Sequence, residues 1–489
     1  MQQNHTEILL QQTISPQLSV NLSKIRTIAE GSSDLLVNEF VLSVDNLPFR
    51  MGEGMLSTST MTELILKPIT AIRLECPTAA NVFAFIRNHQ LYSIDRAEAS
   101  TYADLFRFLN SGFAVLVLDG ADSALVFGIQ GYDKRSVSEP SGEDNVMGAK
   151  DGFIEVVRVN MSLLRRRMKT PQLKLELFVK GSKSQTDLCL CYMADRVPQS
   201  LIAQIKARLD EMELESILSS GYLQPFLENR RGCLFDTVGT TQRPDVLCAK
   251  LLEGRVGLLI DGTPFALVIP KLFCESFQTM DDYCYRPAYA TLVRWIKYAA
   301  FLVAVLLPAL YVAIALHHPE LLNRTLLLIL ADAEENAPIS LTAEAIGVLL
   351  VYEIIREAGL RLPKAVGGAV SIVAGLIIGD AAVASGLIST PMLTVTAIAV
   401  IAGFVVPDLA QSITLLRLAF LLIAGFWGLF GISLLGAAVL FNLCAGESFG
   451  FPITAPIAPL YKKGFRDTLT RVSFRKMQSG SFTVEEYHE

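Results

Sequence analysis

Charge is distributed very unevenly along this chain of 489 residues. Residues 1–290 have mixed polarity, but Asp, Glu, Lys and Arg are absent from the stretch between Lys297 and Glu320, from Ala381–Val406 and from Leu418–Gly446. A helix of about 20 apolar residues can cross the hydrocarbon core of a bilayer. The pattern therefore predicts a helical, polytopic membrane region that follows a large water-soluble region.

Composition narrows the class of protein further. The mean hydropathy of +0.42 exceeds that of an ordinary soluble protein, and the net charge of −6 gives no reason to expect a nucleic-acid partner. The eight cysteines contain no Cys-x-x-Cys spacing, so neither a zinc site nor a redox pair is indicated. Phosphate-loop, His-Glu-x-x-His and Gly-x-Ser-x-Gly motifs are also missing from the sequence. We expect neither an enzyme nor a bound cofactor or metal.

The soluble region contains two similar patterns. Apolar runs flank Asp119-Gly120 and Asp261-Gly262, and Asp-Gly favours the tight turn of a β-hairpin. A predicted helix precedes each hairpin, and a further strand pair is expected at 173–180 and 187–194, with a helix at 198–213 after it. We predict an α+β region of two similar α/β subdomains, residues 1–147 and 148–290, although unrelated hairpins could share the same turn chemistry. A helical transmembrane domain, 291–446, and a basic cytoplasmic tail, 447–489, follow.

The side of the membrane is predicted from charge. The polar start of the chain does not resemble a secretory signal, so we expect the large N-terminal region in the cytoplasm. Basic residues near membrane spans mark the cytoplasmic side, and they stand before the first apolar run and after the last one: Arg294, Lys297, Lys462, Lys463, Arg466, Arg471, Arg475 and Lys476. Both ends would then be cytoplasmic, which requires an even number of crossings.

The number of crossings stays open between four, five and six. A shorter apolar run at 365–379 can span the membrane if Asp380 at its end is paired or faces a cavity. Leu341–Leu360 either spans the membrane or lies at its surface. Leu418–Gly446, with four internal glycines, forms either one tilted helix or a bent hairpin.

Charged residues embedded in these apolar segments are the candidate functional residues. Leu341–Leu360 carries Glu344, Glu353, Arg356 and Glu357. Carboxylates at membrane depth can replace the lost hydration shell of a cation, so these residues and Asp380 predict an ion path. Alternatively, Glu353 and Arg356 simply pair, three residues apart on one helix, and the segment is interfacial.

A second group of candidate residues lies in the soluble region, where Arg165, Arg166 and Arg167 follow one another. They predict a contact with a neighbouring subunit or with anionic lipid headgroups. The alternative is a helix face whose arginines are solvated or paired with carboxylates.

The chain resembles the GerA family, the A subunits of bacterial spore germinant receptors, from about Ser32 to the basic tail. The matching stretches are Lys134–Pro140, Gly152–Arg167, Thr241–Pro270, Leu307–Glu320, Glu353–Pro363, Gly368–Gly386 and Ser448–Pro459. The resemblance implies a membrane subunit of the spore inner membrane that acts with B and C subunits. It also implies a homo-oligomer, a pentamer, that forms a nutrient-gated channel for monovalent cations.

Alternatives remain within and beyond that resemblance. The family includes paralogues that only modulate germination, and a secondary transporter also uses Gly-rich apolar segments with a buried acid. A membrane-tethered scaffold is a third class.

Where the family usually has Gln, this chain has Asp380, and where it often has a following Glu, it has Ala384. The segment 331–337 is also more acidic than usual, so the ion preference is left open.

Overall fold

The structure of the protein is a computed structural model that describes residues 2–42, 47–53, 79–88, 96–128, 140, 142–143, 145–228, 233–335, 339–362, 379, 381–461 and 464–477. The chain forms two compact units. Unit 1 consists of the residues up to Arg230 together with Val238–Lys271, and unit 2 consists of Arg231–Thr237 together with Leu272–Gly480. Each unit is described by itself.

The first part of unit 1 is an antiparallel sheet with helices. Its elements are α1 (Gln2–Gln11), α2 (Leu18–Ala29), β1 (Leu36–Leu42), β2 (Leu47–Glu53), α5 (Ala79–Asn88), β3 (Arg96–Ala99), α6 (Tyr102–Leu109), β4 (Ala114–Leu118) and β5 (Ala124–Phe127). The strands lie in the order β1-β2-β4-β5-β3. The apolar faces of α2 and α6 pack with β4 and β5 in one buried core.

The second part of unit 1 repeats this plan. Its elements are α7 (Val157–Arg167), β6 (Leu173–Lys180), β7 (Thr186–Met193), α8 (Gln199–Asp210), η2 (Ser220–Tyr222), α9 (Gln224–Leu227), β8 (Gly239–Thr241), α10 (Pro244–Leu252), β9 (Val256–Ile260) and β10 (Ala266–Ile269). The strand order β6-β7-β9-β10-β8 matches that of the first sheet position by position. We call these two parts the first and the second subdomain.

The two subdomains also share a helix cap made by the hairpin turn. Asp119 Oδ1 accepts a hydrogen bond from the backbone N–H of Leu18 at 2.9 Å, and Asp261 Oδ1 accepts one from Val157 at 3.0 Å. In each case a carboxylate satisfies a free N–H group at the start of a helix, α2 in the first subdomain and α7 in the second. The Asp-Gly turns therefore fix a helix as well as a hairpin.

An asparagine near the start of the same helix makes a second matching contact. Asn21 bonds both the N–H and the C=O of Ser15, and Asn160 does the same to Ile154. Both asparagines are buried. Corresponding hydrogen bonds in the same positions of the same topology indicate two copies of one structural plan, beyond a shared turn type.

The hairpins expected from the Asp-Gly turns are confirmed. β4 pairs with β5 and β9 with β10, both antiparallel. Gly120 and Gly262 have φ values of 83° and 85°, which only glycine adopts at little cost. The expected strand pair and helix of the second subdomain are β6, β7 and α8, with ends that differ from the prediction by a few residues.

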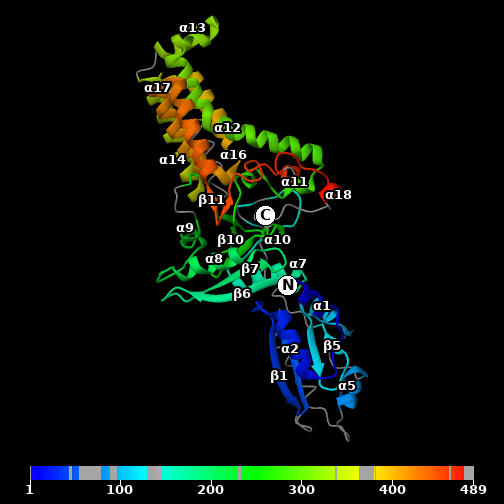
Figure 1. Cartoon of the computed structure of the whole chain (residues 1–489). Helices are drawn as coiled ribbons and strands as arrows, with labels where there is room; N and C mark the ends of the chain where they lie inside the picture. The colour runs from blue at the N-terminus through cyan, green and yellow to red at the C-terminus, as the bar shows by residue number, and fades with distance from the viewer. Residues whose placement is uncertain are drawn as a thin grey trace. The chain divides into compact units, whose positions relative to one another are not determined.

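Unit 2 is mainly helical. Its elements are η3 (Phe273–Phe277), α11 (Asp281–Cys284), α12 (Pro287–His317), η4 (Pro319–Leu321), α13 (Arg324–Glu335), α14 (Leu341–Arg361), α16 (Thr390–Phe404), η5 (Pro407–Leu409), α17 (Ala410–Ala445), β11 (Glu447–Ser448), β12 (Phe451–Pro452), η6 (Gly464–Arg466) and α18 (Phe474–Met477). Among the described residues, Pro287–His317 and Pro407–Ala445 are long and apolar enough to cross a membrane. The helices α12, α14, α16 and α17 pack together in one bundle (Figure 1).

α17 reverses its direction at Gly428. This residue has φ 57° and ψ −142°, outside helical geometry. Ser412 and Asn442, near opposite ends of α17, both hydrogen-bond Leu234, at 2.9 and 3.0 Å. A straight helix would hold them about 45 Å apart, so α17 is a hairpin of two helical arms. Of the two alternatives for this segment, the bent hairpin is confirmed.

The contacts of the reversal define one end of the bundle, which we call the His317 end. His317, the last residue of α12, lies with its Nε2 2.9 Å from Gly425 O. Thr342 at the start of α14 also packs against Gly425. The opposite end, where both arms of α17 meet Leu234, is called the Leu234 end.

The helices α14 and α16 both begin at the His317 end. Ser389, which caps α16, hydrogen-bonds Glu344 in the first turn of α14. Further along α14, Glu353 contacts Thr414 in the second turn of α17, near the Leu234 end. Two successive helices thus run in the same direction. The predicted span at 365–379 lies between them and, except for Gly379, outside the described residues.

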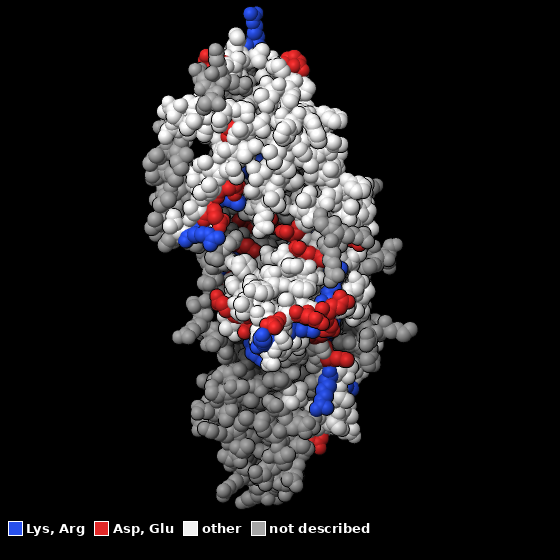
Figure 2. Space-filling model, turned by 90° about the vertical axis from the view of Figure 1, so that its left-hand side faces the viewer, with Lys and Arg blue, Asp and Glu red and all other residues white. Residues whose placement is uncertain are grey.

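Charged side chains are scarce on the middle of the helical unit. Figure 2 shows a largely white, uncharged band on the upper part of this face, with acidic and basic residues above and below it. The exposed side chains include many large apolar groups, among them Ile401, Phe404, Phe426, Phe430 and Phe441. An exposed apolar band of this kind is typical of a surface that faces lipid or other apolar helices.

Candidate functional site

Glu353 is the centre of a polar group inside the helical bundle. Its Oε2 lies 2.7 Å from Arg356 Nη2 on the same helix, as the interfacial alternative expected. Its Oε1 accepts a hydrogen bond from Thr414 Oγ1 on α17 at 3.1 Å. The carboxylate is thus shared between two helices, because a carboxylate has accepting capacity for more than one donor.

Arg417, one turn beyond Thr414, was not among the predicted site residues. Its side chain is only 4% exposed. Its Nε donates to the carbonyl of Ala304 on α12 at 2.8 Å, and its Nη2 lies 3.5 Å from the carbonyl of Ala399 on α16. A signal was present in the sequence, since Arg417 is the single basic residue between Asp408 and Gly446. An embedded cation of this kind is a functional hypothesis by default.

Glu344 has a different environment from Glu353. It is 1% exposed, and its Oε1 accepts from the backbone N–H and the hydroxyl of Ser389 at 2.6 and 2.7 Å. It therefore caps the N-terminus of α16, where a negative charge is favourable. Its Oε2 is buried without a hydrogen-bond partner. Glu344 and Glu353, nine residues apart on α14, are about 13 Å apart along the helix axis.

The remaining residues of the predicted ion path do not join this group. Glu357 pairs with Arg361 at 2.6 Å, and both side chains are exposed. Asp380 lies outside the described residues. The structure therefore brings together Glu353 and Arg356 from the predicted set and adds Thr414 and Arg417.

The three consecutive arginines of the second subdomain are all paired. Arg165 is 1% exposed and binds Asp34 through two hydrogen bonds of 2.9 Å. Arg166 and Arg167 both bind Asp151. The carboxylate-paired alternative thus describes the triplet. Arg165 is enclosed within unit 1, which leaves Arg166, with a 49% exposed side chain, for the predicted contact with a partner or headgroup.

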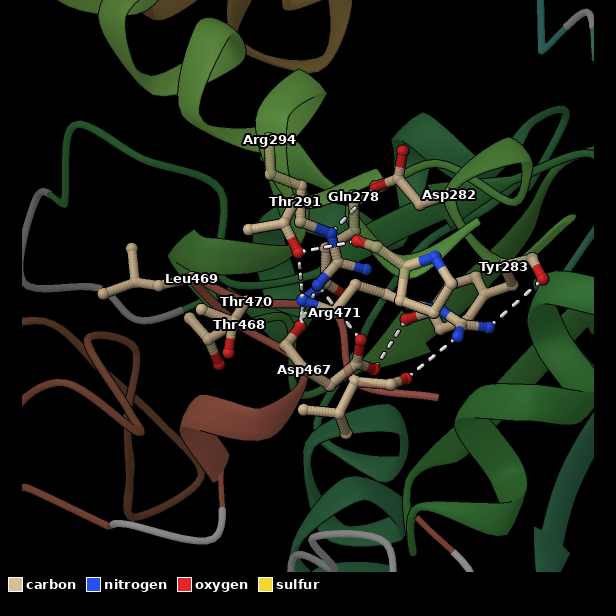
Figure 3. A network of polar contacts seen from close by, with 12 residues as sticks. Gln278, Asp282, Tyr283, Thr291, Arg294, Asp467, Thr468, Leu469, Thr470 and Arg471 are labelled. Carbon is tan, nitrogen blue, oxygen red and sulfur yellow. Dashed lines mark hydrogen bonds and ion pairs between the residues drawn. The ribbon is translucent and has the colours of Figure 1, made fainter. Parts of the chain in front are cut away.

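A second polar network lies where α12 begins (Figure 3). Arg294 Nε donates to Asp282 at 2.9 Å, and its Nη1 binds both the carboxylate and the backbone carbonyl of Asp467. Lys297 lies 3.3 Å from the same Asp282. Arg471 donates to the carbonyl of Tyr283 at 3.2 Å. This network fastens residues 467–471 to the start of α12.

The network includes three of the basic residues on which the topology prediction rests. Arg294, Lys297 and Arg471 are all buried. Arg294 and Lys297 are neutralised by carboxylates. The exposed basic residues of the described tail are Arg466, Arg475 and Lys476, which are available to act on anionic headgroups.

The chain thus combines an α/β unit of two repeated subdomains with an apolar helical bundle that contains a polar group. The sequence profile described as "Bacillus/Clostridium GerA spore germination protein" matches residues 23–481. The chain belongs to the GerA spore germination family.

Several relatives match over most of their length. The chain is 35% identical to "Spore germination protein KA" of Bacillus subtilis (strain 168), over 94% of this chain and 85% of the relative. It is 34% identical to "Uncharacterized membrane protein YfkQ" of the same organism, over 95% and 90%, and 31% identical to its "Spore germination protein B1", over 94% and 95%. These names describe germination and membrane proteins.

A solved structure is also similar. It is the N-terminal domain of the A subunit of the Bacillus megaterium spore germinant receptor GerK3, with 28% sequence identity and a TM-score of 0.42. The match covers 54% of this chain and 98% of that structure.

Proposed function

We propose that this chain is the A-type subunit of a spore germinant receptor and that its helical unit conducts monovalent cations when the receptor responds to a nutrient. The observation that carries the proposal is the polar group of Glu353, Arg356, Thr414 and Arg417 in a largely apolar helical bundle. Charged groups inside an apolar helical bundle are costly and mark ion or proton pathways. The family supplies the biological setting, the inner membrane of the spore.

The proposal includes an assembly. By family membership, the chain acts with B and C subunits and forms a homo-oligomer, a pentamer, around the conducting path. The exposed apolar residues of α16 and α17 offer surfaces for helix contacts with lipid or with neighbouring copies.

Six membrane crossings fit the described helices best. α12 and the first arm of α17 run toward the His317 end, and α14, α16 and the second arm of α17 run away from it. Because α14 and α16 run in the same direction, the chain has to return between them, and we assign that sixth crossing to the predicted span at 365–379. Each arm of α17 is about 26 Å long, close to the thickness of the hydrocarbon core.

The test is potassium release from liposomes that contain the purified full-length chain. Glu353→Gln removes the negative charge of the polar group and keeps the size of the side chain. We expect the release rate to fall about tenfold, the order expected when a charged hydrogen bond is lost. Glu357→Gln is the matched control, because Glu357 lies one turn away on an exposed surface. We expect its release rate to stay within about twofold of the native rate.

The outcomes separate the candidate functions. Equal effects of both substitutions would move the conduction path away from Glu353. Release that saturates with a co-transported solute would indicate a secondary transporter. A native chain that releases no potassium, alone or with its B and C subunits, would indicate a modulating paralogue or a scaffold.

A further inference from the structure

Pro308 interrupts the hydrogen-bond ladder of α12. Proline has no backbone N–H, so the carbonyl four residues earlier loses its helical partner. That carbonyl belongs to Ala304, which is completely buried in the bundle. A buried carbonyl without a partner is unfavourable, and in membrane helices such a group is satisfied by a neighbouring helix.

Arg417 provides the missing donor. Its Nε lies 2.8 Å from the Ala304 carbonyl, so a charged side chain of α17 replaces the backbone N–H that Pro308 lacks. Gly403 on α16 makes room for this side chain, because a Cβ atom there would lie only 3.2 Å from Arg417 Nη2. Three helices therefore meet at one guanidinium group.

The guanidinium group is incompletely satisfied in this arrangement. Its Nη1 is buried without a hydrogen-bond partner, and its Nη2 contact with Ala399 is long at 3.5 Å. The side chains of α14 that act on it electrostatically are Tyr352, Glu353 and Arg356. Glu353 is already joined to α17 through Thr414, one turn before Arg417. Arg417 therefore has one unused N–H donor group, and the carboxylate of Glu353 acts on it. In this structure, however, its hydrogen bonds go to backbone carbonyls and not to that carboxylate.

Building on the proposed function, we propose that Arg417 is a positioning residue for ion conduction, which holds α12 closed at its proline break. Release of the Ala304 carbonyl frees α12 to bend at Pro308, since a helix bends where its ladder is interrupted. The released guanidinium then pairs with Glu353. The closed and open arrangements differ in which acceptor Arg417 binds.

A double-mutant cycle in potassium-loaded liposomes tests this proposal with the full-length chain. Arg417→Gln removes the charged donor, and we expect the resting potassium leak to rise about tenfold, the factor that corresponds to one charged hydrogen bond. Pro308→Ala restores the N–H that bonds Ala304. In that background Arg417→Gln should change the leak by less than about twofold, because the two substitutions act on one interaction.

Two further variants act as controls. Arg417→Lys keeps the charge and one donor, so its resting leak should lie near the native value. Gly403→Ala displaces the guanidinium from α16 and should raise the leak in the native background but not with Pro308→Ala. If Arg417→Gln does not yield folded protein, Gly403→Ala replaces it in the double-mutant cycle with Pro308→Ala.

The thermal midpoint of each variant is measured alongside the leak. If the two substitutions are coupled in their effect on the thermal midpoint but leave the potassium leak unchanged, Arg417 has a purely structural role and the proposal is wrong. Additive effects on the leak would overturn it as well, since Pro308 and Arg417 would then act independently. Absence of potassium release from the native chain, with its partner subunits included, is the separate result that refutes the proposed function itself.

Discussion

Lys174 lies buried at the junction of the two subdomains. Its ammonium group donates to the backbone carbonyl of Ile28 at 2.8 Å. Burial lowers the pKa of Lys174 from 10.5 to about 8, with the nearby charge of Arg165 acting in the same direction. Removing a cation from water favours its neutral form, and the neighbouring carboxylates offset this only in part.

The lowered pKa predicts a specific pH dependence of stability. Between pH 8 and 10.5 the unfolded chain binds the proton of Lys174 more tightly than the folded chain, so the free energy of unfolding rises with pH in this window. Lys174→Met should abolish this contribution. The check is the difference in apparent Tm between pH 7.5 and pH 9.5, compared for the native chain and the variant.

The control for this prediction is Lys180→Met on the same strand. Lys180 pairs with the exposed Asp210 at 2.7 Å, and an exposed pair of this kind contributes little. The change in Tm with pH should therefore be the same in Lys180→Met as in the native chain. If Lys174→Met also retained the native pH dependence, the ammonium group would not be the titrating group.

At the scale of single elements, the reversal of α17 depends on Gly428. Its backbone angles are accessible essentially to glycine alone, and a Cβ atom there would lie 2.9 Å from His317 Cβ. We expect Gly428→Ala to lower stability by about 1–3 kcal/mol. Gly436→Ala is the control, because no atom lies within 4 Å of the added Cβ and alanine favours helix. Thermal unfolding in detergent distinguishes them, and equal midpoints would contradict the reversal.

The elements differ in how far sequence alone could predict them. The Asp-Gly hairpins could be predicted because turn chemistry is local. The common plan of the two subdomains could be seen only in part, since the matching contacts of Asn21 and Asn160 depend on tertiary structure. The apolar segments of α12 and α17 were predictable from length and composition.

The candidate site was only partly predictable, for a physical reason. Glu353 and Arg356 are neighbours on one helix, so their pairing could be anticipated. The other partner of Glu353 is 61 residues away in sequence, and the Arg417 contact spans 113 residues. Such pairs are set by helix packing. The uncharged apolar runs predicted the membrane class, and the resemblance supplied the family, which the comparisons confirm.

For the whole chain, the proposed topology places the two ends of the helical bundle on opposite sides of the membrane. Single cysteines at Asn323, Gln411 and Leu460, all exposed positions, test this in a chain whose native cysteines are replaced. We expect a membrane-impermeant maleimide to label Asn323→Cys in intact cells. Gln411→Cys and Leu460→Cys should react only after the cells are permeabilised.

Comparing the side from which Gln411→Cys and Leu460→Cys are labelled decides whether α17 crosses the membrane once or twice. These residues flank α17, so labelling from opposite sides would mean that α17 crosses once, and the proposed count of six would be wrong. Labelling of both from the inside agrees with two arms and an even number of crossings.

The helix caps made by Asp119 and Asp261 also constrain how the protein is made. Each cap joins residues 101 or 104 positions apart. The capped helices α2 and α7 are translated early in their subdomains, but each receives its cap only after the last hairpin of that subdomain has left the ribosome. Both caps can form before α12, which begins at Pro287, has left the ribosome. Translation order therefore allows the α/β unit to finish folding in water before any apolar helix needs a membrane.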